Sequence, residues 1–526
     1  MGEMAIQRPP ECAAYLWALM GVCILILLGG GHHVCALGFA LVLPGVALLL
    51  QPPQRSLGKW IDVGIVGMLG VMLFAFVPMS YWQEPVWRTT AIDVFGIELP
   101  AVLTVQPWMS FEAFLLAIAG FSWLYAAGNW KVNVEGRRKI YFAVSCAISL
   151  FATIVILGNL YGWRYPGAKD STAFSFFPNR NQTVDFIAIG GVLAFGYSME
   201  GLRGKKLSHV VGLVASLLSL LALISGLSRA GVMLYFGGIF LWLIFILRRT
   251  AASHFLKIGL PIVLLFFSFF ITSHDTAVTR TTELISSSAN WGSDFRVLMF
   301  RDTLKMIQDA PLTGVGLGNF STIFPQYRNL SRTEHNVVHP ESDLTWLATE
   351  GGLVVILFLA ILIVSYFRKC RASMNGRSGA YRTIALIGVI MFLVHGLFDV
   401  SGHRPGTAYF AIIFAALALP NPLKNRPTFK PVIWRCLGAG LLFIGVLWII
   451  GGLFYLPTHS TMALDIEESR AVESRSLHDL DRASQAVDAV IALQPMQWRG
   501  YFQRAQIALS RGGDRFEVEQ DFRRAR

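Results

Sequence analysis

Charged residues are scarce in this sequence. They make up 14% of its 526 residues, whereas a soluble globular protein carries roughly 25%. Apolar residues make up 54% and form runs long enough for bilayer-crossing helices, which take about 20 apolar residues each. This composition excludes a soluble enzyme with one membrane anchor, and it also excludes a disordered chain. The runs are continuous and do not alternate with polar residues, which excludes a transmembrane β-barrel.

Cysteine pairs of the Cys-x-x-Cys type are also missing. The six cysteines are Cys12, Cys23, Cys35, Cys146, Cys370 and Cys436. Most of them lie inside or beside apolar runs, so we expect neither a disulfide framework nor a zinc site. The first apolar run follows Arg8 and has no small-residue cleavage site after it. We therefore expect a retained first span rather than a removed signal peptide.

About thirteen apolar runs predict an all-α polytopic membrane protein. The predicted spans are 13–30, 34–50, 61–79, 111–128, 140–162, 183–199, 208–227, 230–247, 258–273, 344–367, 383–400, 406–420 and 434–455. The connecting loops alternate in Lys and Arg content, and short loops rich in these residues stay cytoplasmic. Most of the net charge of +12 lies in such loops, for example at Arg137 and Arg371. This alternation predicts a cytoplasmic N-terminus and a C-terminus on the outer, periplasmic side.

The sequence predicts two domains that meet at about residue 456. Residues 1–456 form the membrane domain, with an outer loop at about 274–343, and residues 457–526 form a polar helical tail. The spacing of Ala483, Val487, Val490 and Pro495 resembles the second helix of a tetratricopeptide repeat. One repeat and a fragment cannot bury a solenoid core alone. We therefore expect either that the native chain continues past Arg526 or that the tail contacts the membrane domain.

Four polar segments on the predicted outer face are candidates for chemistry. They are residues 177–182, 228–231, 296–320 and 335–343. Charges at this depth are costly, and three of the segments contribute an arginine, whose fork binds phosphate oxygens in a bidentate way. A single arginine at an interface can simply extend its charged group into water, and residues 314–318 can be a plain flexible turn. No strand precedes that glycine run, so it is not a dinucleotide-binding loop. The convergence of the segments predicts a pocket for a diphosphate attached to a lipid.

The order of these segments resembles the O-antigen ligase superfamily, which includes O-antigen ligases, O-antigen polymerases and protein O-oligosaccharyltransferases. The resemblance covers roughly residues 140–415, and residues 179–181 and 228–231 are similar to the two upstream landmarks. Its most specific motif is met by Arg296, Phe300, Arg301, Pro311, Leu312, Gly314, Gly316, Gly318 and Phe320. The last landmark is a histidine before a span with Glu-x-Gly. Counting back from Glu350, that position holds Glu341, and His339 lies two residues earlier.

The resemblance implies a type C, metal-independent glycosyltransferase of the bacterial inner membrane that needs no cofactor. The donor would be an undecaprenyl-diphosphate-linked glycan, the acceptor a hydroxyl of a glycan, lipid or protein, and the transfer inverting. Arg180, Arg229, Arg296 and Arg301 would bind the donor diphosphate and stabilise it as it leaves. His339 or Glu341 would be the general base, with His335 ranked behind them. The tail could bind a protein partner, and nucleic acid is not expected as a partner.

Two other functions stay open. A transporter or flippase of lipid-linked glycans would have a similar number of spans, and His395 and Asp399 are the best evidence for a relay inside the membrane. Transporters, however, tend to show paired repeats and charges at mid-span, and the sequence shows no such symmetry. A scaffold with an inert membrane part is disfavoured by the arginines. Deleting the tail would separate a scaffold from an enzyme, because a scaffold would lose its function entirely whereas an enzyme should retain some chemistry.

Overall fold

The computed structural model describes residues 12–165, 173–202, 208–226, 229–247, 295–331, 337–372, 374, 378–421 and 430–525. In these ranges the chain forms nineteen α-helices, so the all-α prediction is confirmed for them. Seven of the described helices are long and apolar enough to cross a bilayer, and five shorter apolar helices accompany them. The protein is therefore a multi-pass membrane protein. The expected number of about thirteen spans stays a prediction, and the expected span 258–273 lies outside the described residues.

The helices gather in two compact units, each assembled from three separate segments of the chain. The first unit holds Met1–Gly30, Leu124–Leu298 and Tyr366–Pro427. The second holds Gly31–Trp123, Met299–Ser365 and Thr428–Arg526. The predicted division into a membrane domain and a tail at residue 456 stays a prediction.

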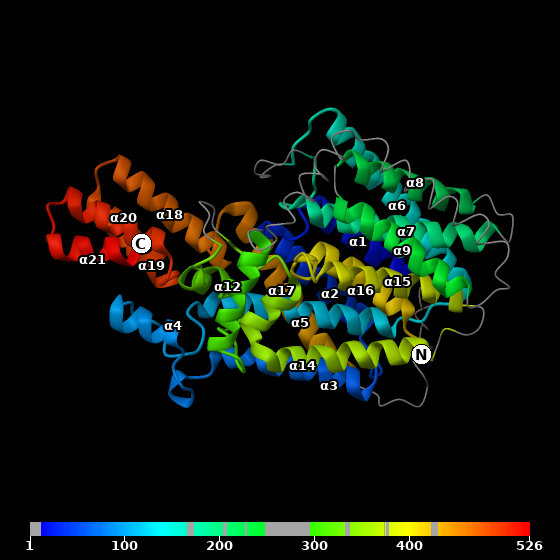
Figure 1. Cartoon of the computed structure of the whole chain (residues 1–526), viewed down its shortest axis with the longest axis horizontal. Coiled ribbons are helices and arrows are strands. Elements are labelled where there is room, and N and C mark those ends of the chain that lie inside the picture. The colour runs from blue at the N-terminus through cyan, green and yellow to red at the C-terminus, as the bar shows by residue number, and fades with distance from the viewer. Residues whose placement is uncertain are drawn as a thin grey trace, which may run out of the picture. The chain divides into compact units, whose positions relative to one another are not determined.

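The first unit is a bundle built around α7 (Figure 1). Its helices are α1 (Ala13–Leu27), α6 (Val134–Leu160), α7 (Arg180–Leu202), α8 (Ser208–Ser225), α9 (Arg229–Leu247), α15 (Gly379–His395) and α16 (Pro405–Ala418). Small residues let the neighbours of α7 approach closely, as is usual between membrane helices. A Cβ atom added to Gly191 would lie 2.6 Å from Ser219 of α8, and one added to Gly196 would lie 2.8 Å from Ile384 of α15.

A buried arginine closes one end of this bundle. Arg137 stands in the first turn of α6, where its guanidinium donates to the carbonyl of Leu417 in the last turn of α16. A cation at a helix C-terminus is favourable because it faces unpaired carbonyl groups. At the same end, the Tyr141 hydroxyl donates to the Tyr381 carbonyl over 2.7 Å. The sequence placed Arg137 in a basic loop; the structure shows instead that its side chain is buried and ties two helices together.

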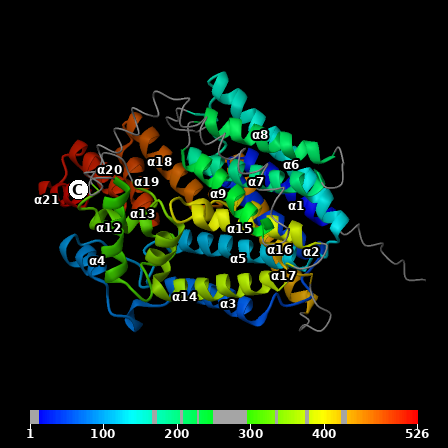
Figure 2. The ribbon, with the colours of Figure 1, turned by 45° about the vertical axis from the view of Figure 1, so that its right-hand side comes forward.

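The second unit contains the apolar helices α2 (Val34–Leu50), α3 (Lys59–Met72) and α17 (Pro431–Phe454) and most of α5 (Pro107–Asn129) and α14 (Asp343–Arg371). Figure 2 shows α3, α5 and α14 running alongside one another. Met68 and Val71 of α3 form a buried cluster with Val355 of α14, against which Phe121 of α5 packs. Shorter helices of this unit are α4 (Val86–Thr89), α12 (Phe295–Asp309, whose first residues belong to the first unit) and α13 (Phe320–Ile323).

The polar tail forms four helices. They are α18 (Ser460–Ser476), α19 (Leu480–Leu493), α20 (Trp498–Ser510) and α21 (Arg515–Ala525). Ala483 and Val487 of α19 are buried against Ala471 of α18 and Ile507 of α20. Each helix therefore packs on its neighbour, as the predicted apolar spacing requires. The assignment of these helices to the tetratricopeptide family stays a prediction.

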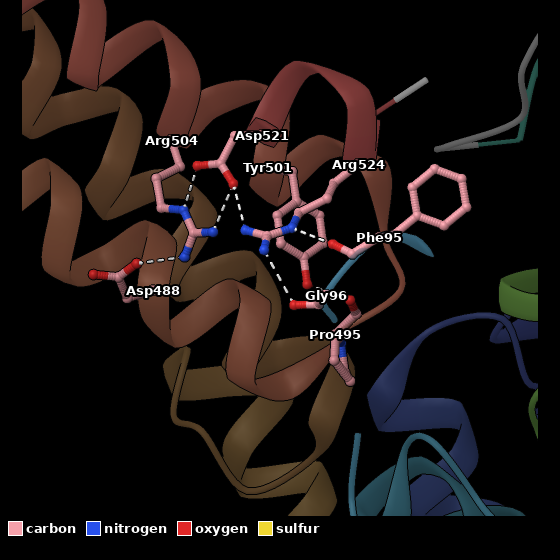
Figure 3. Close-up of polar contacts among 8 residues, drawn as sticks. All are labelled: Phe95, Gly96, Asp488, Pro495, Tyr501, Arg504, Asp521 and Arg524. Carbon is pink, nitrogen blue, oxygen red and sulfur yellow. Dashed lines mark hydrogen bonds and ion pairs between the residues drawn. The ribbon is translucent and has the colours of Figure 1, made fainter. Parts of the chain in front are cut away.

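The tail is fixed at both of its ends to other parts of the second unit. At its start, the Ser460 backbone N–H donates to the Glu112 carboxylate of α5 over 2.7 Å, and His459 Nε2 lies 3.3 Å from the same group. Burial lowers the pKa of His459 to about 4, so its ring is neutral at pH 7. At its end, Arg524 donates to the carbonyls of Phe95 and Gly96 over 2.7 and 3.1 Å (Figure 3). The expectation that the tail contacts the rest of the chain is met inside this unit.

A chain of ion pairs holds the last two tail helices together (Figure 3). Arg504 of α20 forms a bidentate pair with Asp521 of α21, at 2.6 and 2.7 Å. Asp521 also accepts from Arg524 over 2.9 Å, and both guanidinium groups lie over the ring of Tyr501. The partner carboxylate raises the pKa of Arg504, which stays charged. Bidentate pairs of this geometry are the strong class of charged hydrogen bond, so α21 is held in place although it is short.

Candidate functional site

Arg180 is the first residue of α7, and the loop before it is tightly bonded. Ser175 Oγ lies 2.8 Å from Thr183 Oγ1, and the same threonine oxygen accepts from the Phe176 backbone N–H over 3.0 Å. The Asn179 side chain accepts from the Asn181 backbone N–H over 2.9 Å, as is usual for asparagine in a turn. The Arg180 side chain itself is exposed. The predicted arginine thus projects from a fixed base, which suits a group that must bind an anion at a defined place.

Arg229 begins α9, and the packing of α9 against α7 places both arginines at the same end of the first unit. A Cβ atom at Gly191 would lie 2.9 Å from the Tyr235 ring, and the Phe195 and Trp242 rings are 5.3 Å apart. Later residues of α7 therefore meet later residues of α9, so the two helices run in parallel. Their first residues consequently lie at one end of the bundle.

A buried carboxylate and imidazole meet near this end, between α7 and α15. Asp185 Oδ1 lies 3.7 Å from His395 Nδ1, and the Ser401 hydroxyl lies 3.0 Å from the same nitrogen. The sequence grouped His395 with Asp399 as two residues one helical turn apart. The structure differs, because α15 ends at His395 and Asp399 lies in the turn that follows, where it accepts from the Val400 N–H. Asp185, the partner of His395, was missed because sequence spacing does not show which helices pack together.

Arg296 and Arg301 both lie on α12, and both are exposed. The buried face of the same helix holds Asp302, whose Oδ2 accepts from the backbone N–H groups of Leu330 and Ser331, each over 2.9 Å. This carboxylate fastens residues 330–331 to α12. The helix therefore has one face that fixes these residues and another that leaves its arginines open to solvent.

The glycine-rich loop (residues 311–320) lies against a break in α14. Gly352 has φ +69°, outside the helical region, and any Cβ there would overlap the carbonyl of Leu312. Directly after the break, the Leu353 N–H donates out of the helix to the Pro311 carbonyl over 2.7 Å. Only glycine adopts this conformation at low cost while a second backbone lies so close.

The same break frees carbonyl groups in the preceding turn, and the loop bonds to them. The Val315 N–H donates to the Thr349 carbonyl over 2.9 Å, and the Gly316 N–H donates to the Glu350 carbonyl over 3.1 Å. Gly314 has φ +65° and passes so near this turn that a Cβ would lie 2.5 Å from the Thr349 carbonyl. The loop is therefore paired backbone to backbone with α14, and the reading of it as a plain flexible turn is wrong.

The carboxylate of Glu350 completes this arrangement. Its Oε2 accepts from the Gly318 N–H over 2.8 Å, and its Oε1 accepts from the Phe320 N–H over 3.1 Å. Oε1 also accepts from the indole N–H of Trp346, one turn earlier in α14, over 2.8 Å. The buried Glu350 side chain thus holds the end of the glycine-rich loop and orients Trp346. In the sequence Glu350 is recognisable only as part of a landmark motif, and these hydrogen bonds were not predicted.

His339 and Glu341, the two candidate bases, lie next to each other just before α14. His339 Nδ1 is 3.4 Å from Glu341 Oε1. The imidazole stacks on the Trp346 ring, with centroids 5.8 Å apart and planes inclined by 27°. Glu341 has φ +54°, a left-handed backbone that a non-glycine residue rarely adopts. His335, the lowest-ranked candidate, lies outside the described residues.

The structure thus brings the predicted residues together in separate groups. Arg180 and Arg229 share one end of the first unit, and His339 and Glu341 are neighbours in the second. The convergence of all four arginines on one diphosphate, with His339 or Glu341 as base, stays a prediction. No group of three or more His, Cys, Asp or Glu side chains in the described part of the chain could hold a metal ion; independence of metal also stays a prediction.

Comparison with known proteins bears on these residues directly. Residues 214–360 match the family model described as O-antigen ligase. The matched range includes Arg229, Arg296, Arg301, His339, Glu341 and Glu350, whereas Arg180 precedes it. The comparison with curated proteins finds no match.

Proposed function

From the O-antigen ligase domain at residues 214–360, which makes the chain a transferase of polyprenyl-linked glycans, we propose a donor, an acceptor and a place for the reaction. The donor is an undecaprenyl-diphosphate-linked glycan and the acceptor is a hydroxyl. The transfer takes place at the periplasmic face of the bacterial inner membrane. The observation that carries the proposal is the pair of His339 and Glu341 at 3.4 Å, held beside the glycine-rich loop of that domain. An acceptor hydroxyl is activated by a general base within hydrogen-bond reach of its proton, and this pair offers such a base.

The proposed reaction is a single displacement. The base takes the proton of the acceptor hydroxyl while that oxygen attacks the anomeric carbon. The bond between this carbon and the diphosphate oxygen breaks, and its electron pair leaves with the lipid diphosphate. One displacement inverts the anomeric centre. The negative charge that develops on the leaving group needs stabilisation, which Arg180, Arg229, Arg296 and Arg301 supply without a metal ion.

The arginines suit this task for a physical reason. A guanidinium group stays charged at any pH near neutrality and offers parallel N–H donors that match two phosphate oxygens. The common end that Arg180 and Arg229 share in the first unit supports a joint site for these two. The exposed positions of Arg296 and Arg301 on α12 leave them able to reach a ligand.

Transport of the same lipid-linked glycan is the second candidate. One observation favours it: the Asp185–His395 pair is buried between two apolar helices, and ionisable groups inside a membrane often mark a transport path. The O-antigen ligase domain favours transfer. The two functions differ in their product, because a transporter leaves the glycan attached to its lipid.

The proposal is tested with purified protein, a labelled lipid-linked oligosaccharide and a set of glycan, lipid and protein acceptors, with mass analysis of the products. We expect a new glycosidic product, unaffected by EDTA, and a loss of about 10²–10⁴-fold in rate for His339→Ala. Arg180→Lys and Arg229→Lys should slow transfer although the charge is kept, because the bidentate fork is lost. Arg470→Lys, on an exposed ion pair of the tail, is the matched control and should retain full rate.

Three results would contradict the proposal. The absence of product with every acceptor, together with movement of intact donor across vesicles, would indicate transport. Loss of activity in EDTA that Mg²⁺ or Mn²⁺ restores would require a bound metal ion. Full activity in both the Arg180 and Arg229 lysine variants would remove these residues from the donor site.

A further inference from the structure

The backbone of Glu341 is the starting point. Only three non-glycine residues in the described part of the chain have positive φ: Glu341, Tyr455 and His478. Tyr455 ends α17 and His478 follows α18, where left-handed residues are common. Glu341 instead precedes a helix, with only Ser342 between itself and Asp343, the first residue of α14. Strained backbones of this kind persist where the surroundings impose them and are frequent at functional sites.

The side chain shows what the backbone conformation achieves. It brings the Glu341 carboxylate to 3.4 Å from Nδ1 of His339, two residues earlier. An imidazole has two nitrogens. A carboxylate beside one of them favours the tautomer that carries the proton there, which leaves the other nitrogen to act as a base. Nδ1 of His339 faces the Glu341 carboxylate at this distance, so Nε2 is the nitrogen left to take a proton.

The other side of the imidazole is also fixed. Trp346 stacks on the ring, and its own indole N–H is directed to Glu350. Because Glu350 also accepts from the glycine-rich loop, the imidazole plane is tied to the most specific motif of the domain. His339 is thus oriented by two groups, Glu341 at one nitrogen and Trp346 at the ring face.

We propose that Glu341 is not a second base but the positioning partner of His339, so that the two form a carboxylate–imidazole dyad in which Nε2 of His339 takes the acceptor proton. This inference rests on the proposed function. The proton moves from the acceptor hydroxyl to Nε2 and leaves later to water, and no other reactant is needed. The Glu341 carboxylate stabilises the imidazolium that exists in between, as an aspartate does in a serine-protease triad.

Three substitutions at one position separate charge from backbone strain. Glu341→Gln removes the charge and keeps a side chain that disfavours positive φ. Glu341→Asn also removes the charge but tolerates the left-handed region, and Glu341→Asp keeps the charge and tolerates that region. The matched control is Tyr455→Asn, which relieves the same backbone conformation at φ +56° outside the candidate site.

We expect the Gln and Asn variants to lose at least about tenfold in kcat, up to the ~10²–10⁴-fold that a general base is worth, with the donor KM within twofold of wild type. Without the carboxylate, the imidazolium is less favoured, so the acid limb of the pH–rate profile moves to lower pH. Glu341→Asp should recover part of the lost kcat. A residue with a purely structural part would not move the pH profile.

The unfolding temperature should depend on the backbone strain at position 341, whereas kcat should depend on the charge there. We expect Glu341→Asn to unfold about 1–3 °C above Glu341→Gln, because the strain is relieved. Tyr455→Asn should likewise gain stability, but with unchanged kcat. The Asn variant would then be more stable than the Gln variant and no more active.

The outcomes distinguish the dyad from the proposed function. If the wild-type protein transfers glycan but both uncharged variants keep its kcat and pH profile, the dyad is wrong. If His339→Ala retains activity while Glu341→Gln loses it, Glu341 is itself the base and the assignment is reversed. If the wild-type protein transfers nothing, the proposed function fails before the dyad is examined.

Discussion

Gly352 shows how one residue determines the geometry around the candidate site. Its φ of +69° ends the first part of α14, and the carbonyls that this break releases bond the glycine-rich loop. We expect Gly352→Ala to lower the free energy of unfolding by about 2–5 kcal/mol, because the new methyl group meets the Leu312 carbonyl and the left-handed backbone becomes strained. Denaturant unfolding of the purified protein in detergent measures this.

Gly120→Ala is the control for the first substitution. Gly120 lies inside α5 and has no atom within 4 Å of an added Cβ. The Gly120→Ala substitution should raise the free energy of unfolding by up to about 1 kcal/mol, because alanine has a better helix propensity than glycine. Equal effects of the two substitutions would mean that the break at Gly352 is not needed for the fold.

At the residue scale, the sequence predicted the types of side chain in the site better than their bonds. Arg180 could be recognised because a charge just before an apolar run is costly and therefore conspicuous. The contact of Asp185 with His395 could not be foreseen, since it joins residues 210 positions apart in two different helices. The sequence shows that His339 and Glu341 lie two positions apart, and from it both are candidates for the general base. It does not show the left-handed backbone of Glu341, which turns its side chain toward His339.

At the element scale, glycine faces decide which helices pair. Gly38 and Gly45 of α2 meet Gly445 and Gly438 of α17, so the two helices run antiparallel with their backbones in contact. In a bilayer, apolar surface alone does not favour one helix partner over another, and small residues that permit close approach do. We expect this face to account for much of the stability of the α2–α17 pair.

Two glycines of α17 test that expectation. A Cβ at Gly445 would lie 2.6 Å from the Gly38 carbonyl, whereas one at Gly440 meets nothing within 4 Å. Gly445→Leu should therefore lower the free energy of unfolding by about 1–3 kcal/mol or more. Gly440→Leu, on the exposed side of the same helix, should lower it little. Thermal unfolding in the same detergent compares them. A similar loss in both variants would show that added bulk, and not the glycine face, is responsible.

Helices themselves were readily predicted from the sequence, but their ends and partners were not. Long apolar runs can satisfy their backbone groups in a bilayer only as helices, and for this reason twelve of the thirteen predicted spans coincide with described helices. The break inside α14 was not foreseen, because Gly351 and Gly352 look like ordinary small residues in an apolar run. Which helix packs on which depends on contacts such as that of Gly45 with Gly438, which no local pattern encodes.

At the scale of the whole molecule, each compact unit is assembled from distant parts of the chain. Ser460 of the tail bonds to Glu112 of α5 across 348 positions, and Arg524 near the C-terminus reaches Gly96. The sequence separated the tail from the membrane domain by composition, which changes sharply at residue 456. Composition cannot show that polar helices dock on a membrane helix through a few buried groups such as His459.

Membrane orientation is the last property that the whole chain determines. In the first unit, the end of the bundle that holds Arg137 is opposite the end at which α7 and α9 begin, because α15 starts beside Tyr141 and ends beside Asp185. The Arg137 end, predicted to be cytoplasmic, and the end at which α7 and α9 begin, predicted to be periplasmic, are therefore opposite ends of this bundle. Positive charges stay on the cytoplasmic side during insertion, so the Arg137 end should face the cytoplasm.

Cysteine labelling of intact spheroplasts tests this orientation, in a variant whose six native cysteines are replaced. Arg137 is buried and would resist a maleimide on either side, so the cytoplasmic probe is better placed at Lys139, whose side chain is 61% exposed. The periplasmic probe is Val472 of α18, which is 62% exposed. We expect a membrane-impermeant reagent to label position 472 and to leave position 139 unlabelled until the cells are opened. Labelling of position 139 from outside would reverse the orientation of the bundle and place the Arg180 end in the cytoplasm, where a periplasmic transfer reaction could not use it.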